Sequence, residues 1–247
     1  VILSNLGHSS KALGFTAGFT GEALENMLKE FGCDTAFIRL PEGSTRINVK
    51  INAGEETEIN GQGPVITEEA QSALFEQLDA LKEEDILVLA GSIPNTLPSD
   101  IYERILEHLQ GRGIHFVVDA TKELLLKVLK YHPFLIKPNN HELGEMFGVT
   151  LKTRDEIVTY AKKLQKMGAE NVLVSMAGDG AILLTEDGII YKAKPPKGKV
   201  LNSVGAGDSM VAGFLTGYLN TGEYEKAFRL GVVTGSATAF QYWLATK

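Results

Sequence analysis

The sequence predicts a doubly wound α/β fold, in which a mainly parallel sheet is flanked by helices on both faces. From Asp85 onward, short apolar runs alternate with segments of helical periodicity. The apolar runs are continuous, as in 86–90, and continuous runs are typical of parallel strands buried on both faces. A chain of 247 residues can bury about three quarters of its unfolded surface. We therefore expect residues 1–247 to form a single α/β domain.

The main body divides into strands and helices that follow one another along the chain. The dipeptide Asp187-Gly188 is typical of a two-residue turn between antiparallel strands, so an antiparallel hairpin should follow the parallel strands. In order, we expect strands over 86–90, 115–119, 134–137, 171–175, 181–185 and 189–193, and helices over 98–110, 122–130, 154–167, 208–219 and 223–240.

The first 65 residues follow a different pattern. A helix is expected over 21–31, followed by strands over 35–39, 45–51 and 57–60. Residues 46–51 alternate strictly between polar and apolar side chains, which predicts a strand with one face exposed or covered by a partner. We expect residues 35–62 to form a small β lid beside the main body.

Charge and composition narrow the classes of function. The chain carries 24 Lys and Arg against 31 Asp and Glu and has no basic block, so we expect neither a nucleic acid nor a membrane as its partner. No apolar run approaches the length of about 18 residues that a membrane span needs, and we expect a cytoplasmic protein. The single cysteine, Cys33, excludes an internal disulfide and a multi-thiolate metal site. These observations favour a site for a small molecule.

Polar and small residues stand directly after each predicted parallel strand. Ligands of open α/β sheets bind at the carboxyl ends of the strands. The residues in these positions are Gly91-Ser92, Asp119, Lys137-Pro138-Asn139 and Met176-Ala177-Gly178. We expect them to meet at one edge of the sheet.

The segment from Asn202 to Asp208 has the composition of an anion-binding loop. Gly205, Ala206 and Gly207 open a predicted helix, so their backbone N–H groups can face one concavity to which the helix dipole adds positive potential. An acid beside such a loop would repel a bound phosphate, but it suits a base that accepts a proton during phosphoryl transfer. The alternative is that Asp208 only caps the helix.

The chain contains neither G-x-x-x-x-G-K-[ST] nor a strand-linked G-x-G-x-x-G near its start, so phosphate chemistry must use another scaffold. The segment 202–208, followed by Met210-Val-Ala-Gly-Phe214, resembles the C-terminal signature of the PfkB/ribokinase family of sugar kinases. Four further segments, 45–50, 57–61, 90–94 and 136–142, resemble the members of that family that phosphorylate ketohexose monophosphates. The resemblance runs through nearly the whole chain and implies a ribokinase-like fold.

The resemblance implies ATP-dependent phosphorylation, first of all of fructose 1-phosphate to fructose 1,6-bisphosphate. It makes Asp208 the catalytic base. It implies that the amides of Gly205, Ala206 and Gly207 stabilise the negative charge that develops on the transferred phosphoryl group. It makes Lys137 a contact of the nucleotide phosphates. Tagatose 6-phosphate or fructose 6-phosphate as substrate, or a non-catalytic sugar-phosphate-binding module, are the alternatives.

For the cofactors, ATP and Mg²⁺, the resemblance points to two further sets of residues. Asn139 and Glu142 would organise Mg²⁺, partly through water, although the same spacing suits an N-cap and a first-turn charge. The nucleotide side would include Ser175, Gly178, Gly180 and Gly235. The alternatives are turn positions for Gly178 and Gly180, and packing of a small-residue helix face against the sheet for Gly235.

On the sugar side, the resemblance makes Arg46 the contact of the phosphate already on the sugar, with Asn48 on the same strand face. Ser92 would contact the sugar, and Asp119 would shape the site. The alternatives are protection of a strand edge for Arg46 and a turn hydroxyl for Ser92. The lid strand, with one bare face, favours a homodimer.

The family also carries an early Asp and a Gly-Gly-x-Gly-x-Asn segment that contact the sugar, and neither is present in this sequence. If the protein itself were truncated before these segments, we would expect little kinase activity, because one wall of the sugar pocket and part of the central sheet would be missing.

Overall fold

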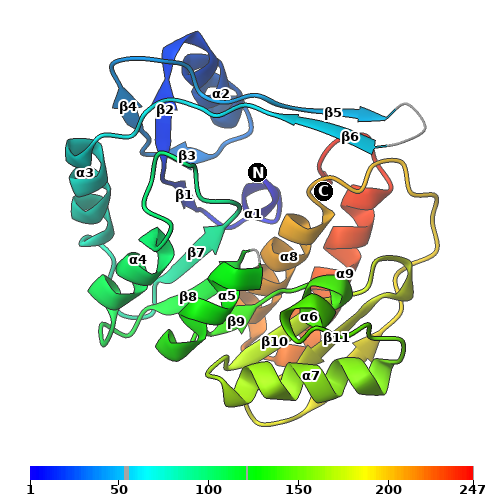
Figure 1. The fold of residues 1–247 in the computed structure, drawn as a ribbon. Helices are drawn as coiled ribbons and strands as arrows, with labels where there is room; N and C mark the ends of the chain where they lie inside the picture. The colour runs from blue at the N-terminus through cyan, green and yellow to red at the C-terminus, as the bar shows by residue number, and fades with distance from the viewer. Residues whose placement is uncertain (53–55, 121, 247) are drawn as a thin grey trace. The chain divides into compact units, whose positions relative to one another are not determined.

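The computed structural model describes residues 1–52, 56–120 and 122–246 (Figure 1). The chain forms two compact units. Unit 1 contains Val1, Ser9–Leu81 and Ile93–Ile101, and unit 2 contains Ile2–His8, Lys82–Ser92 and Tyr102–Lys247. The residues expected to form the lid all belong to unit 1, and the residues expected at the strand ends all belong to unit 2.

Unit 2 is built on a six-stranded sheet with the order β12-β11-β10-β9-β8-β7. The four strands from β7 to β10 are parallel, whereas β11 pairs antiparallel with both β10 and β12. The sheet therefore confirms the mainly parallel arrangement and the antiparallel hairpin that the sequence predicts. The strands are β7 (Ile86–Ala90), β8 (His115–Asp119), β9 (Leu135–Ile136), β10 (Asn171–Ser175), β11 (Ala181–Leu184) and β12 (Ile190–Ala193).

Helices cover both faces of this sheet (Figure 1). One face carries α5 (Lys122–Val128), α6 (Asn140–Met146) and α7 (Arg154–Lys166). The other carries α8 (Ala206–Thr221) and α9 (Tyr224–Ala239). The remaining helical elements are α1 (Ile2–Asn5), α4 (Ile101–Leu109) and the 3-10 turns Leu129–Tyr131 and Ala177–Asp179. This ribokinase-like layering confirms the predicted fold class.

The two C-terminal helices pack closely on each other because small residues line their contact. A Cβ atom on Gly213 would lie 2.5 Å from Thr234 Oγ1, and one on Gly217 would lie 2.6 Å from the Cα of Ala227. Phe214 and Phe228 face the sheet and form a core with strand residues such as Leu173, all buried. The glycines of the sequence thus bring α9 against α8, while the large side chains fill the space beneath.

Unit 1 contains short strands that pair over long sequence distances. The strand β2 (Phe15–Ala17) is parallel to β4 (Ile38–Leu40), and β1 (Lys11–Ala12) is parallel to β3 (Asp34–Thr35). The hairpin of β5 (Asn48–Asn52) and β6 (Glu56–Asn60) is a separate two-stranded sheet. The segment 35–39, expected as a lid strand, therefore pairs with 11–17 rather than with the hairpin.

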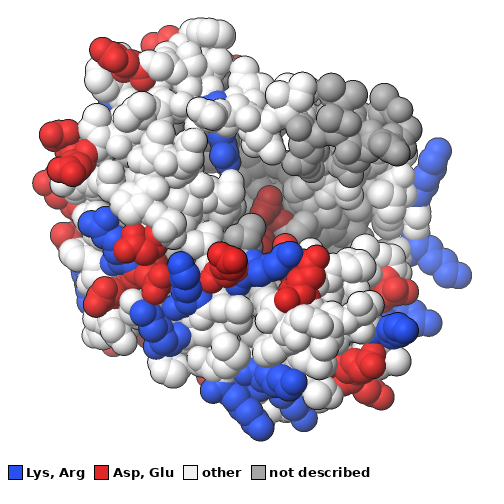
Figure 2. Space-filling model, in the orientation of Figure 1, with Lys and Arg blue, Asp and Glu red and all other residues white. Residues whose placement is uncertain are grey.

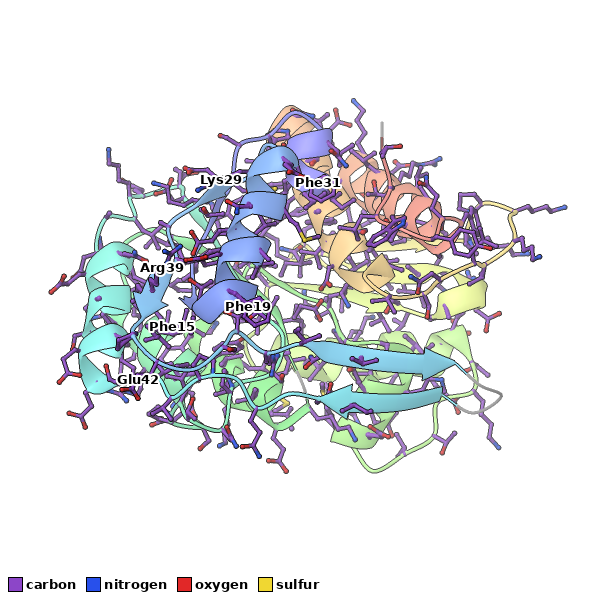
Figure 3. All side chains as sticks on the ribbon, turned by 90° about the horizontal axis from the view of Figure 1, so that it is seen from above. Phe15, Phe19, Lys29, Phe31, Arg39 and Glu42 are labelled. Carbon is purple, nitrogen blue, oxygen red and sulfur yellow. The ribbon has the colours of Figure 1, made fainter. Side chains whose placement is uncertain are left out.

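Two helices accompany these strands, α2 (Gly18–Glu30) and α3 (Glu68–Leu78). Ala17, Leu40, Ile66 and Ala70 form a small buried core. Arg39 extends from β4 towards α2, where it pairs with Glu22 and Glu25 at 3.4 and 3.5 Å (Figure 3).

Charged side chains of both signs are mixed on the face over α5, α6 and α7 (Figure 2). Lys122 pairs with Glu145 there, and Lys192 pairs with Asp155 at 3.2 Å. Within the part of the chain that the structure describes, every helix falls short of the length and apolar character that a membrane crossing requires.

Candidate active site

The carboxyl ends of the parallel strands meet at one edge of the unit 2 sheet. The registers that fix this are Ala90 opposite Asp119, and Ile136 opposite both Val118 and Val172. The residues that follow these pairs therefore lie next to each other along the edge, and Asn139 forms an isolated parallel bridge with Ser175. The sheet thus brings together the strand-end residues that the sequence predicts, namely Ser92, Asp119, Lys137, Asn139 and Ser175.

Lys137 and Asp119 form an ion pair at this edge. Lys137 Nζ lies 3.1 Å from Asp119 Oδ2, and the two side chains are only 8% and 19% exposed. Burial raises the pKa of Asp119; Lys137 opposes that effect, and the charges of Asp208 and Glu142 add to it. Three carboxylates, those of Asp119, Glu142 and Asp208, and one ammonium group therefore lie close enough in unit 2 for their charges to act on one another.

The glycine-rich loop leads directly into α8. Gly205 occupies the N-cap position with φ of 77°, a conformation that glycine adopts without strain. A Cβ atom on Gly207 would lie 3.0 Å from Lys137 Nζ, so the lysine ammonium lies against the backbone of the loop. The helix starts at Ala206, two residues before the expected start, and the first-turn amides are therefore those of the loop itself.

Asp208 lies in the first turn of α8, and its side chain is exposed within this structure. Its negative charge nevertheless acts on Asp119, which places it in the same region as the Lys137 ion pair. An exposed carboxylate beside an amide-lined loop can accept a proton from an incoming hydroxyl group.

Asn139 and Glu142 form a complete capping box at the start of α6. Asn139 Oδ1 accepts hydrogen bonds from the backbone N–H groups of His141 (2.9 Å) and Glu142 (2.8 Å). The backbone N–H of Asn139 in turn donates to Glu142 Oε2 at 2.8 Å. The helix cap, which the sequence offered as the alternative to a Mg²⁺ site, is therefore present. The Glu142 carboxylate still has a second oxygen and further lone pairs that can bind an ion or a water molecule.

The two glycines of the loop after β10, Gly178 and Gly180, differ in the space around them. Gly180 has φ of 92°, and a Cβ atom there would collide with the carbonyl oxygen of Ala193, so the backbone itself requires glycine. Gly178, in contrast, would place a Cβ atom in open space, with no atom of the described residues within 4 Å. The nucleotide-side role of both remains a prediction, and open space at Gly178 is compatible with a ligand there.

Comparison with known proteins decides the family. Residues 1–245 match the pfkB family carbohydrate kinases. The chain belongs to this family of carbohydrate kinases. Over 239 aligned residues, this chain is 55% identical to the 1-phosphofructokinase of Bacillus subtilis (strain 168). The alignment covers 97% of this chain and 78% of that protein. The D-tagatose-1-phosphate kinase of Bacillus licheniformis is 37% identical, with the same coverage of 97% and 78%.

A solved structure confirms the fold of this carbohydrate kinase. The tetrameric inhibited form of phosphofructokinase-2 from Escherichia coli is similar with a TM-score of 0.86 and 29% identity, over 96% of this chain and 79% of that one.

Two predicted residues of the kinase lie in unit 1, at the start of the β5–β6 hairpin. Arg46 and Asn48 are both exposed, and Asn48 starts β5 opposite Asn60. A Cβ atom on Gly61 would lie 3.0 Å from the carbonyl oxygen of Ile47, so this glycine lets the backbone at residue 61 approach the residue after Arg46 closely. Lys50, four residues after Arg46 in the sequence, lies outside the described side chains.

Gly235 contacts α8 instead of the sheet. A Cβ atom on it would lie 2.9 Å from the carbonyl oxygen of Ala206 and 3.2 Å from Cβ of Met210. The glycine therefore lets α9 approach the first turn of α8, directly behind the glycine-rich loop. Its role towards the nucleotide of the kinase remains a prediction.

Tyr102 is a further residue at this edge of the sheet, outside the predicted site residues. Its hydroxyl group donates to the carbonyl oxygens of Ala90 (2.9 Å) and Gly91 (3.2 Å). These hydrogen bonds hold the turn before Ser92. Burial, with a smaller effect of the Asp119 charge, raises the pKa of Tyr102 to about 12. The phenol therefore stays a neutral donor. No motif marks this residue, because its role depends on how α4 rotates relative to β7.

Proposed function

We propose that this carbohydrate kinase transfers the γ-phosphoryl group of ATP to the 6-hydroxyl of fructose 1-phosphate, giving fructose 1,6-bisphosphate and ADP. The observation that carries the proposal is the meeting of Lys137 with the Gly207 backbone at the start of α8, one residue before Asp208. The 55% identity to a 1-phosphofructokinase supports the choice of sugar phosphate.

In the proposed reaction, Asp208 accepts the proton of the sugar hydroxyl while the sugar oxygen attacks the γ-phosphorus. The bond from that phosphorus to the bridging oxygen breaks, and ADP leaves with the electron pair. The amides of Gly205, Ala206 and Gly207, aided by the α8 dipole, stabilise charge on the transferred group. Lys137 adds a positive charge beside them. Positioning and charge neutralisation supply most of the barrier reduction.

The donor set near Lys137 is compatible with Mg²⁺ bound together with nucleotide phosphates. Three carboxylates, Asp119, Glu142 and Asp208, outnumber the single ammonium group, so a divalent cation would balance the surplus before a polyanion binds. Among the described residues, no three His, Cys, Asp or Glu side chains form a metal cage. That suits Mg²⁺, which is held by one or two carboxylates plus phosphates and water.

We assign the Mg²⁺ contacts to Asn139 and Glu142, partly through water, and the nucleotide side to Lys137, Ser175, Gly178, Gly180 and Gly235. When bound, Mg²⁺ would neutralise charge on the nucleotide phosphates. We assign the phosphate of the sugar to Arg46, helped by Asn48, because a guanidinium group binds phosphate with two parallel hydrogen bonds. Ser92 is assigned to the sugar hydroxyls.

Tagatose 1-phosphate is the second candidate substrate. A relative with 37% identity is named a D-tagatose-1-phosphate kinase, which favours a phosphate on carbon 1 over the tagatose 6-phosphate that the sequence suggested. Fructose 6-phosphate is a third candidate substrate. A non-catalytic sugar-phosphate-binding module is the candidate of a different class, but such a module would have no use for an acid beside the anion-binding loop.

We further propose a homodimer through the lid hairpin. Val49 and Ile59 face each other across the hairpin and are 45% and 57% exposed, and Ile47 is 61% exposed. An isolated two-stranded hairpin is marginally stable at best, so a second copy over this apolar face would stabilise it. The cytoplasmic location and the interpretation as one kinase domain with a lid over 35–62 stay predictions.

The deciding experiment measures ADP release with fructose 1-phosphate, tagatose 1-phosphate, tagatose 6-phosphate and fructose 6-phosphate under the same conditions. We expect fructose 1-phosphate to give the highest kcat/KM. An Asp208→Asn variant should keep ATP binding by calorimetry while kcat falls by roughly 10² to 10⁴. Unchanged turnover in that variant would remove Asp208 as the base.

A further inference from the structure

The Lys137–Asp119 ion pair has a geometry that goes beyond a contact between two strands. Lys137 N–H donates to the carbonyl oxygen of Val118 at 3.3 Å, and Ile136 is paired with Val118, so residues 137 and 119 are neighbours at the ends of β9 and β8. Their side chains leave the sheet together and meet at 3.1 Å. The pair is therefore fixed at its base by sheet register and at its tip by charge.

The tip of Lys137 also touches the glycine-rich loop. The ammonium lies 3.0 Å from the position of a Cβ atom on Gly207, which is closer than most Cβ contacts, so the tip of the lysine lies against the loop backbone. A lysine side chain has a flexible four-carbon stem and loses rotamer entropy when it is fixed. A partner that holds its end in one place removes that loss from the binding step.

Stability alone gives no reason for this pair. Taking two charges out of water costs about as much as their attraction returns, so a buried ion pair is weak support for a fold. The other carboxylates nearby, Asp208 and Glu142, make the position less favourable for a further negative charge. A carboxylate kept there against these effects points to a role in the site.

We propose that Asp119 is a positioning residue, which holds the Lys137 ammonium against the Gly205–Gly207 loop so that ammonium and loop amides face the transferred phosphoryl group together. This inference rests on the proposed kinase function. Asp119 contacts neither sugar nor nucleotide in it; it acts through Lys137. The ammonium is in place before the phosphoryl group arrives, and its position does not have to be selected during the reaction.

A double-mutant cycle tests this inference, with the variants Asp119→Asn, Lys137→Met and the combination of both. We expect Asp119→Asn to lower kcat by roughly 10-fold to 100-fold with KM for the sugar phosphate within about threefold, because a misplaced group costs turnover more than binding. In the Lys137→Met background, the same substitution should change kcat by less than about threefold, since there is no ammonium left to position. If the effects of the two single substitutions on kcat simply multiply in the double variant, Asp119 acts independently of Lys137 and the inference is overturned.

Two controls separate positioning from a general loss of structure. Asp119→Glu keeps the charge on a longer arm and should recover part of the kcat lost in Asp119→Asn, whereas full loss in both variants counts against positioning. Asp155→Asn makes the same chemical change in an exposed ion pair, with Lys192 at 3.2 Å, and should leave kcat unchanged. The melting temperature of each variant shows that the protein folds.

The outcome for Asp208→Asn in the same assay distinguishes failure of the proposed reaction from failure of the positioning role of Asp119. If Asp208→Asn keeps full turnover, the proposed reaction fails and the positioning role fails with it. If Asp208→Asn is inactive while Asp119→Asn matches the wild type, only the positioning role is overturned.

Discussion

Asn139 and Glu142 hydrogen-bond each other's backbone at the start of α6, at distances of 2.8 Å in both directions. The chain contains a second capping box of the same kind at the start of α7. There, Glu156 N–H donates to Thr153 Oγ1 at 3.2 Å, and Glu156 Oε2 accepts from the N–H of Thr153 at 2.8 Å. Only the first box lies at the strand-end edge, so the two boxes form a matched pair for separating capping from a function in the site.

We expect Glu142→Gln to raise the Mg²⁺ concentration for half-maximal activity by roughly tenfold or more, because the amide removes a negative charge that the cation would face. Glu156→Gln makes the same change in the cap of the next helix, α7, and should leave the Mg²⁺ dependence unchanged. Activity measured over a series of Mg²⁺ concentrations checks this. Identical Mg²⁺ curves for the two variants would mean that Glu142 is only a cap.

Tyr102 gives a prediction about stability at alkaline pH. The pKa of Tyr102 is raised to about 12, mainly by burial, from its ordinary value near 10. Because the folded pKa is the higher one, the contribution of Tyr102 to folding is fully present below about pH 10 and is lost as the pH rises towards 12. Tyr102→Phe removes this contribution along with the hydrogen bonds to the Ala90 and Gly91 carbonyls.

The expected result is that Tyr102→Phe unfolds more readily by about 1 kcal/mol near neutral pH. The difference from the wild type should shrink above about pH 10, which thermal melts of both proteins over the alkaline range would measure. Other titrating groups affect both proteins alike. A constant difference up to about pH 12 would contradict the raised pKa of this phenol.

Arg46 has a matched control within unit 1. Arg46→Ala should raise KM for the phosphorylated sugar by roughly 10-fold to 100-fold and leave KM for ATP nearly unchanged, since a charge-assisted contact to phosphate is lost. Arg39→Ala removes an exposed arginine that pairs with Glu22 and Glu25 on α2, and both Michaelis constants should stay within about twofold. Steady-state kinetics with each substrate varied in turn checks this. A rise confined to the ATP constant in Arg46→Ala would refute the assignment.

The sheet edge could be predicted because its determinants are local. Continuous apolar runs such as 86–90 and 115–119 fix the parallel strands, and the polar residue after each strand then falls at one edge. The pairing of Lys137 with Asp119 needs the register between β8 and β9, which the sequence does not contain. The hydrogen bonds from Tyr102 to the carbonyl oxygens of Ala90 and Gly91 depend on how α4 is rotated relative to β7, which the sequence does not contain either.

The strands β1 to β4 of unit 1 were harder to predict because they are two or three residues long and pair across long sequence distances. A strand such as Phe15–Ala17 is too short to show periodicity, so its pairing with Ile38–Leu40 follows only from packing around Ala17 and Leu40. The helix α3 was not predicted although Thr67 followed by two glutamates is a helix-start pattern, and Thr67 Oγ1 accepts from the N–H of Ala70 at 3.2 Å.

The exposed apolar face of the β5–β6 hairpin supplies the last prediction, on assembly. Val49→Lys should shift the protein from dimer to monomer in sedimentation equilibrium, because two copies of the new charge would face each other near the symmetry axis. Phe31→Lys places the same charge on the C-terminal end of α2, where Phe31 is 52% exposed against 45% for Val49, and should leave the dimer intact. A wild-type protein that is monomeric at all concentrations, or a dimer that survives Val49→Lys, would contradict assembly through the hairpin. Dissociation by Phe31→Lys alone would place the interface on α2 instead.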